Sequence, residues 1–413
     1  MTMTRLASAQ VSRRAVTFAG VGLLLGACSR TMTDDSGGGT GNEATIAVLA
    51  PLSGDQSALG LGIQHSVELA AAQANERNVV PGWTIKVTGR DDQASPDTGR
   101  AEVTELIDDG SVVAVVGALN TQVSVAVLPD LAEAGIALVS PGNTSPVLTR
   151  GDRPVQAPTR PFDNFFRTIA TDDKQPAVAA RHLLSQLENR TVAVVHDGTD
   201  SGQALAEAFT AQFTSRGGSV VADGAIDPQS TDYSAMVRAL RDKGPEAVFF
   251  GGNPPQAGPL SEQVKAADLQ IPLMGTDALY TPDYPGLAGE TAAGDLATSV
   301  IGPTQQLPAG RRFLTDYQSA GFSQPAEVFG PYAYDAATAI IQALGRTLHD
   351  STDVVAARAA TAQALGEVEF DGAIGPVSFD EFGDCRTQPV TVYQVSENNE
   401  WTAVSTVNAG TDQ

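Results

Sequence analysis

Residues 112–145 read VVAVVGALNTQVSVAVLPDLAEAGIALVSPGNTS, and this stretch decides the fold. The apolar run at 112–116 predicts a buried strand, and the apolar residues of 123–134 recur at the spacing of a helix face. A second short apolar run at 137–139 predicts the next strand. A strand, a helix and a strand in direct succession predict parallel strands joined by a helical crossover.

The same alternation extends along most of the chain and falls into two series. The first series predicts strands and helices in turn at 46–49, 63–74, 85–88, 98–106, 112–116, 123–134 and 137–139. The second begins after Phe162 and predicts helices and strands in turn at 175–187, 192–196, 203–215, 220–222, 233–240, 247–250, 260–267 and 273–274. We therefore expect an α/β fold with two doubly wound parallel-sheet lobes, which suits a chain of 413 residues.

The last part of the chain breaks this alternation. It predicts helices at 332–348 and 354–365, followed by strands at 376–379, 390–395 and 401–404. These elements complete neither series. We therefore expect the chain to cross between the lobes more than once.

The composition excludes several classes of function. A net charge of −23 without a basic stripe argues against nucleic acid as a partner, because the polyanion would be repelled. The four histidines lie far apart and no C-x-x-C motif is present, so we expect neither a metal site nor a cofactor. The stretch G-x-S-x-G, which marks the nucleophile of α/β hydrolases, is also missing, so we expect no enzyme activity.

Residues 1–27 have the pattern of a signal peptide. Arg5, Arg13 and Arg14 precede an apolar run at 16–27, which is too short to span a membrane. Ser12-Arg13-Arg14 is part of a twin-arginine pattern, so the export route stays open between the general secretory and twin-arginine pathways.

The end of this segment, Leu25-Gly26-Ala27-Cys28, resembles the lipobox of bacterial lipoproteins. The resemblance implies that Cys28 becomes the lipidated first residue; an ordinary signal peptide with an incidental cysteine is the alternative. Residues 28–43 would then form the lipidated N-terminus and a glycine-rich flexible tether. If Cys28 is acylated, Cys385 has no partner for an intrachain disulfide.

Ligands of open parallel sheets bind beyond the carboxyl ends of the strands. Three loops rich in small and hydroxyl-bearing residues follow such predicted ends, at 50–54, 117–122 and 140–145. These loops are where a binding site is expected.

At these loops and elsewhere, short motifs make the chain resemble the leucine/isoleucine/valine-binding protein family, the type I periplasmic receptors of ABC importers. The motifs are PLSG at 51–54, DD at 91–92, VG at 116–117, SPGNT at 140–144, HD at 196–197 with Gly202, FFGG at 249–252, MG at 274–275, YAYDA at 332–336 and GPVSFD at 375–380. The order of these motifs over residues 45–404 is more specific evidence for the resemblance than any single motif.

The resemblance implies a hinge with three crossings between the lobes, near residues 167–171, 296–299 and 384–388. Lobe 1 would then comprise 44–167 and 299–385, and lobe 2 would comprise 168–298 and 386–413.

The resemblance also implies a site for an amino-acid head group. Thr121, next to Gln122, is expected to bind the ligand carboxylate; Asn143 and Thr144 are expected on the same head group, and Asp277 on the ammonium. A zwitterion taken out of water needs such partners for both charges. Each residue also has a simpler interpretation: Thr121 as a helix cap, Asn143 and Thr144 as turn formers, and Asp277 as an exposed acid.

Three further positions depart from the family pattern. Leu59, Ser201 and Asn253 stand where family members often place aromatic residues around the ligand. Ser201 and Asn253 offer hydrogen bonds instead, which predicts a more polar or bulkier ligand than leucine. Tyr280 and Tyr332 are the nearest aromatic residues that would replace the missing aromatic side chains around the ligand.

The expected function is that of an extracytoplasmic solute-binding lipoprotein of an ABC importer. It would bind a small amino-acid-like or amide solute between the lobes and deliver it to permease subunits in the membrane. We expect a monomer, anchored through lipid on Cys28 to the outer face of the cytoplasmic membrane. A sensor that signals to a membrane receptor is the main alternative, because the same fold serves both roles.

Overall fold

A computed structural model describes residues 42–410, except 189 and 350. The first sheet of this described part has five parallel strands in the order β2-β1-β3-β4-β5. The strands are β1 Asn42–Ala50, β2 Trp83–Asp91, β3 Val112–Gly117, β4 Ala137–Ser140 and β5 Phe165–Arg167.

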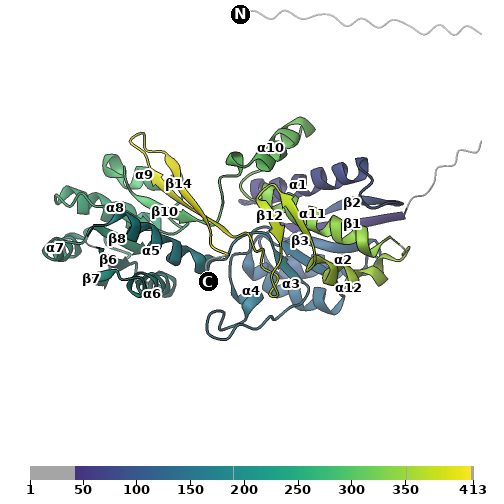
Figure 1. The fold of residues 1–413 in the computed structure, drawn as a ribbon, viewed down its shortest axis with the longest axis horizontal. Helices are drawn as coiled ribbons and strands as arrows, with labels where there is room; N and C mark the ends of the chain where they lie inside the picture. The colour runs from purple at the N-terminus through teal and green to yellow at the C-terminus, as the bar shows by residue number, and fades with distance from the viewer. Residues whose placement is uncertain (1–41, 189, 350, 411–413) are drawn as a thin grey trace, which may run out of the picture. The chain divides into compact units, whose positions relative to one another are not determined.

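Helices cover both faces of this sheet, because alternate side chains of each strand point to opposite faces. Ile46 and Val48 of β1 pack with α1 (Ser57–Glu76), α11 (Gly330–Thr347) and α12 (Val354–Leu365). Ala47 and Leu49 pack with α2 (Pro96–Asp108) and α3 (Thr121–Glu133). The all-apolar runs of the sequence are therefore strands buried on both faces (Figure 1).

The second sheet has seven strands within the described residues, in the order β14-β13-β10-β9-β8-β6-β7. Five are parallel: β6 Thr191–His196, β7 Ser219–Ala225, β8 Ala247–Gly251, β9 Leu273–Gly275 and β10 Leu296–Ser299. The antiparallel hairpin of β13 (Pro389–Val395) and β14 (Trp401–Asn408) pairs with β10 at the edge.

Helices also cover both faces of the second sheet. One face packs on α5 (Gln175–Gln186) and α6 (Asp200–Ser215). The other face packs on α7 (Ser234–Lys243), α8 (Pro254–Ala266) and α9 (Tyr284–Leu287), as Figure 1 shows. The predicted α/β class with two doubly wound lobes is confirmed.

Within the described residues the chain passes between the two sheets three times: after β5, after β10 and before β13. Between the last two passages it forms α10 (Pro308–Ala320), α11, α12 and the hairpin of β11 (Glu369–Gly372) and β12 (Gly375–Ser378). A short helix, α4 (Val147–Arg150), follows β4. The lobe boundaries given above remain our proposal.

A buried network of charges connects the first passage to the third. Arg167 and Asp384 are both fully buried, and Arg167 Nε lies 2.9 Å from Asp384 Oδ1. Asp384 Oδ2 accepts a hydrogen bond from Arg150 Nε at 2.9 Å, and Arg150 Nη2 donates to Asp380 Oδ2 at 2.7 Å. Two arginines and two aspartates compensate one another, as buried charges require.

Cys385 lies beside this network and is fully buried. It forms no disulfide within the described residues, and burial raises the pKa of its thiol to about 12. A thiol that is buried and protonated is a poor nucleophile. In a Cys28→Ser variant, where Cys385 is the one remaining thiol, we expect no reaction with Ellman's reagent in the native protein. One equivalent should react after unfolding in urea, and rapid native reaction would contradict the burial.

The proposed signal peptide, the lipidated Cys28 and the tether lie outside the described residues, apart from the first residues of β1. Among the helices that are described, none combines the length and apolarity needed to cross a membrane.

Candidate functional site

The loops after β6, β8 and β9 of the second sheet line a pocket of about 450 Å³, which we call the Asp277 pocket. It brings together three residues singled out from the sequence, Ser201, Asn253 and Asp277. The segment that enters α5 completes it, and the residues that line the pocket are Asp172, Asp173, Gln175, Pro176, Ser201, Gly202, Ala204, Leu205, Ala208, Gly252, Asn253, Thr276, Asp277 and Ala278. The pocket lies at the carboxyl ends of parallel strands, where ligands of such sheets bind.

Two glycines allow the first turn of α6 to contact the end of β8. A Cβ atom on Gly202 would lie 2.6 Å from the carbonyl oxygen of Gly251, and one on Gly251 would lie 2.2 Å from that of Gly202. Asp197, which is almost fully buried, accepts hydrogen bonds from the backbone N–H of Thr199 at 3.0 Å and from Asn253 Nδ2 at 3.4 Å. The motifs at 196–202 and 249–252 therefore hold Ser201 and Asn253 in place at the pocket.

Gln175 links the carboxylate of Asp172 to the backbone of Asp277 at the centre of the site. Its Nε2 donates to Asp172 Oδ1 at 3.3 Å, and its Oε1 accepts from the backbone N–H of Asp277 at 3.1 Å. Thr298 Oγ1 donates to the same Oε1 at 2.8 Å. From the first sheet, Thr144 Oγ1 donates to Asp172 Oδ2 at 2.7 Å. These bonds hold the side chain of Asp172 and the backbone of Asp277 at one pocket.

The pKa values of Asp172 and Asp277 are both raised, which favours the neutral form of each carboxyl group. Burial, and then the charge of Asp277, raise the pKa of Asp172 to about 6. Burial likewise raises the pKa of Asp277 above its ordinary value. Among the described residues that line the pocket there is no Lys, Arg or His. A cationic group that enters the pocket would therefore find acceptors that lack a counter-ion.

Thr121 is the first residue of α3, and Asn120 occupies the cap position before it. The interpretation of Thr121 as the helix cap is therefore wrong. Within the described residues, neither another side chain nor a backbone group hydrogen-bonds its hydroxyl, and Gln122 beside it is exposed. Thr121 thus presents a hydroxyl at a helix N-terminus, which is a suitable place for an anionic group.

Asn143 is fully buried and serves the loop after β4. Its Nδ2 donates to the carbonyl oxygen of Leu119 at 3.0 Å, and its Oδ1 accepts from Ser124 Oγ. Its backbone carbonyl accepts from Arg167 Nη1 at 2.6 Å. A ligand in the pocket would not reach this side chain, so we assign Asn143 to loop structure. Its role is to connect the loop of Thr144 to the buried charge network.

The aromatic compensation expected from the sequence does not occur in this pocket. Tyr332 is fully buried; its hydroxyl accepts from the N–H of Gly302 at 2.9 Å and donates to the carbonyl of Val300 at 3.3 Å. It therefore supports the second passage between the sheets. Tyr280 stacks on Tyr393 with ring centroids 3.9 Å apart and lines a different pocket. Leu59, half-buried on α1, packs against the core of the first sheet.

The sequence patterns missed Asp172, Asp173 and Gln175. These residues lie between the expected crossing at 167–171 and the expected helix from 175, where neither strand nor helix periodicity points to a site. The acidic pair at the entry to a helix is the one signal that would have drawn attention to them.

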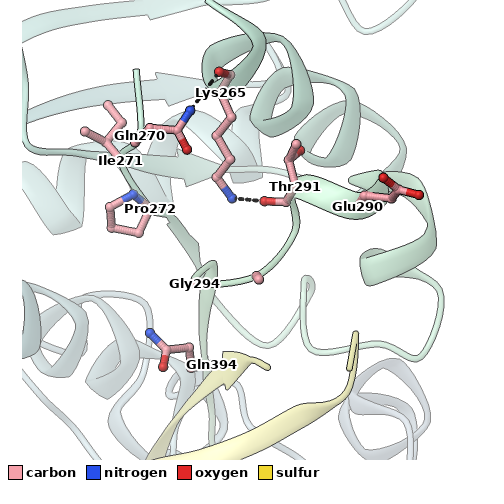
Figure 2. A pocket seen from close by; sticks show the side chains of 9 residues that line it. Lys265, Gln270, Ile271, Pro272, Glu290, Thr291, Gly294 and Gln394 are labelled. Carbon is pink, nitrogen blue, oxygen red and sulfur yellow. Dashed lines mark hydrogen bonds between the residues drawn. The ribbon is translucent and has the colours of Figure 1, made fainter. Parts of the chain in front are cut away.

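A second pocket, of about 500 Å³, lies at the opposite edge of the second sheet, before β9 and β10 (Figure 2). Lys265 is its prominent charged group, and its Nζ donates to the carbonyl oxygen of Thr291 and to Asp295 Oδ1, the latter at 2.8 Å. Since this ammonium already has an anionic partner, the pocket offers a ligand no uncompensated cation.

In the described part of the chain, no three His, Cys, Asp or Glu side chains are grouped to hold a metal ion.

Comparison with known proteins adds independent evidence. Residues 43–400 match the family model described as periplasmic binding protein. The Leu/Ile/Val-binding protein homolog 3 of Brucella melitensis is 31% identical over 353 residues, which cover 85% of this chain and 91% of that protein.

Two crystal structures illustrate the fold. The substrate-binding protein of an ABC transporter from Desulfitobacterium hafniense, in complex with Leu, has a TM-score of 0.69 at 22% identity and covers 88% of this chain and all (100%) of its own. A solute-binding protein of an ABC transporter from R. palustris, in complex with 4-hydroxybenzoate, has a TM-score of 0.65 at 23% identity and covers 89% of this chain and 97% of its own.

Proposed function

Since the chain belongs to the periplasmic binding protein family, we propose that it captures a small amino-acid-like solute and delivers it to a membrane permease. Proteins of this family are extracytoplasmic substrate-binding proteins of ABC transporters, not enzymes. The observation that carries the proposal is the Asp277 pocket, in which two carboxylates without a counter-ion face a space of about 450 Å³.

In this proposal Asp277 and Asp172 bind the ammonium of the solute. The carboxylate of the solute is bound by Thr121, Gln122 and the first N–H groups of α3. Thr144 lies between the ammonium and the carboxylate. The solute would thereby contact both lobes, and such contacts drive closure about a hinge. Ser201 and Asn253 are proposed to contact the side chain of the solute, with Leu59 at the edge of the site.

We further propose that lipid on Cys28 anchors the protein, as a monomer, to the outer face of the cytoplasmic membrane. An anchored receptor would be held close to its permease. Metabolic labelling with a tritiated fatty acid tests this point, because the label should be present in the wild-type chain and absent from Cys28→Ser.

Calorimetric and thermal titration of the purified chain tests the binding function. The panel consists of the natural amino acids, their amides, urea and short organic acids. A ligand present at about 100 times its dissociation constant should add about 2.7 kcal/mol to the free energy of unfolding. A panel in which no amino acid raises the melting temperature would contradict the proposal.

Binding should weaken as the pH falls. An ammonium requires ionised carboxylates, and Asp172 has a pKa of about 6 in the free protein. Protonation of that group alone predicts about a tenfold loss of affinity between about pH 7.5 and about pH 5. Isothermal titration at both pH values measures this. In Asp172→Asn the pH dependence should be smaller, whereas affinity that is constant or rises on acidification would contradict the role of the pair.

A further inference from the structure

We propose that the solute carries a second positive charge, as a basic amino acid of the lysine, ornithine or arginine class does. The inference rests on the proposed function, which places the ligand in the Asp277 pocket. That placement follows from the position of the pocket at the strand ends and from the family to which the chain belongs. The carboxylates of the pocket then indicate the charge of the ligand.

Three carboxylates line the pocket: Asp172, Asp173 and Asp277. Oδ1 of Asp173 is buried and has no hydrogen-bond partner, so it is an acceptor that still lacks a donor. Its other oxygen lies 3.8 Å from Nζ of Lys174, at the limit of an ion pair. Asp173 borders both this pocket and a neighbouring one, whereas Lys174 lines only the neighbouring one.

The nearby cations and polar groups are already engaged. Arg167 contacts Asp384 and donates a hydrogen bond to Thr149 Oγ1 at 2.9 Å. Its charge makes only a minor contribution to the pKa of Asp172, which it lowers. Gln175 and Thr144 donate to Asp172 but carry no charge. The negative charge of the pocket is therefore compensated only in part, by Lys174 at the limit of an ion pair with Asp173 and by Arg167, which is already paired with Asp384.

A neutral amino acid does not resolve this imbalance. It brings one ammonium for three carboxylates and adds a carboxylate of its own, so closure around it would bury anions without partners. A basic amino acid supplies a second cation. The α-ammonium can pair with Asp277 and Asp172, and the second cation with Asp173.

The walls of the pocket suit the stem of such a solute. Its apolar lining residues are Pro176, Ala204, Leu205, Ala208 and Ala278, and no aromatic side chain is among the described residues that line it. A short aliphatic surface that leads to carboxylates matches a methylene chain that ends in a cation. An aromatic side chain would find no aromatic wall among the described residues of the pocket.

The test compares L-lysine with L-norleucine, which has the same linear carbon chain but lacks the terminal ammonium. Isothermal titration of the purified chain at about pH 7.5 and low salt should show lysine binding at least about tenfold more tightly. Asp173→Asn should weaken lysine about tenfold while changing norleucine less than about twofold. The control, Asp242→Asn, removes one charge from exposed α7 and should leave both affinities unchanged.

The outcomes separate the two proposals. If norleucine or leucine binds as tightly as lysine, or if Asp173→Asn leaves the ratio of the two affinities unchanged, the second charge is wrong and the binding function stands. If no amino acid in the panel binds, the proposed function itself fails. A preference for lysine that Asp173→Asn reduces supports both.

Discussion

Asp277→Asn should lower the affinity for the amino-acid solute by about 100-fold or more. The substitution preserves the size of the side chain but removes the proposed charge partner of the ammonium, and loss of one partner of a buried charge pair costs about 2–5 kcal/mol. Isothermal titration with the best amino acid of the panel measures the loss. Retention of affinity within about threefold of wild type would show that the ammonium binds elsewhere.

The same variant should remain folded. Asp277 raises the pKa of Asp172 through repulsion between like charges, so its removal should return that pKa toward the ordinary value and leave the ligand-free protein no less stable. The matched control is Asp283→Asn, the same substitution at an exposed position in the following loop. Its side chain makes no capping hydrogen bond to α9, so neither affinity nor melting temperature should change.

Asp384→Ala should lower the free energy of unfolding by about 3–5 kcal/mol. The substitution leaves Arg167 fully buried without the carboxylate that lies 2.9 Å from its Nε. It also removes the partner of Arg150 Nε, which leaves Asp380 as the remaining anion of the network. An unpaired buried guanidinium is costly because it loses its hydration and gains no counter-ion.

Urea denaturation followed by tryptophan fluorescence measures this loss, because Trp83 lies in the first sheet and Trp401 in the second. The matched control is Glu367→Ala, which breaks the ion pair of Glu367 with Arg346 at 3.4 Å, where both side chains are largely exposed. Such surface pairs contribute about 0–1 kcal/mol. If the two variants lose the same small amount, the buried network does not stabilise the fold as we expect.

Much of the fold was predictable from residue spacing. The uninterrupted apolar run at 112–116 indicated a strand buried on both faces, and β3 is such a strand. Among the short strands, β4 and β9 were predicted, whereas β5 and β10, which lie at the passages between the sheets, were not predicted as strands. Helix α10 was also missed, although its buried residues Gly310, Phe313 and Tyr317 stand at the spacing of one helix face.

Part of the candidate site was expected from the family resemblance. Through it Ser201, Asn253 and Asp277 were assigned to the ligand, and the structure places them in one pocket, Asn253 and Asp277 just after β8 and β9 and Ser201 in the first turn of α6. Tyr332, at the start of α11, is fully buried and does not line this pocket. Asp172 and Asp173 went unnoticed because their segment shows no pattern of its own.

By itself the sequence determined most of the order of strands and helices and the two-lobed class. These follow from short-range spacing, which local sterics and apolar burial impose on neighbouring residues. The tertiary structure alone decided which polar groups meet. Gln175 contacts Asp277 across 102 positions of the chain, and Arg150 contacts Asp384 across 234. Contacts at such separations depend on how the helices, strands and loops within each lobe pack together, and no local spacing in the sequence encodes them.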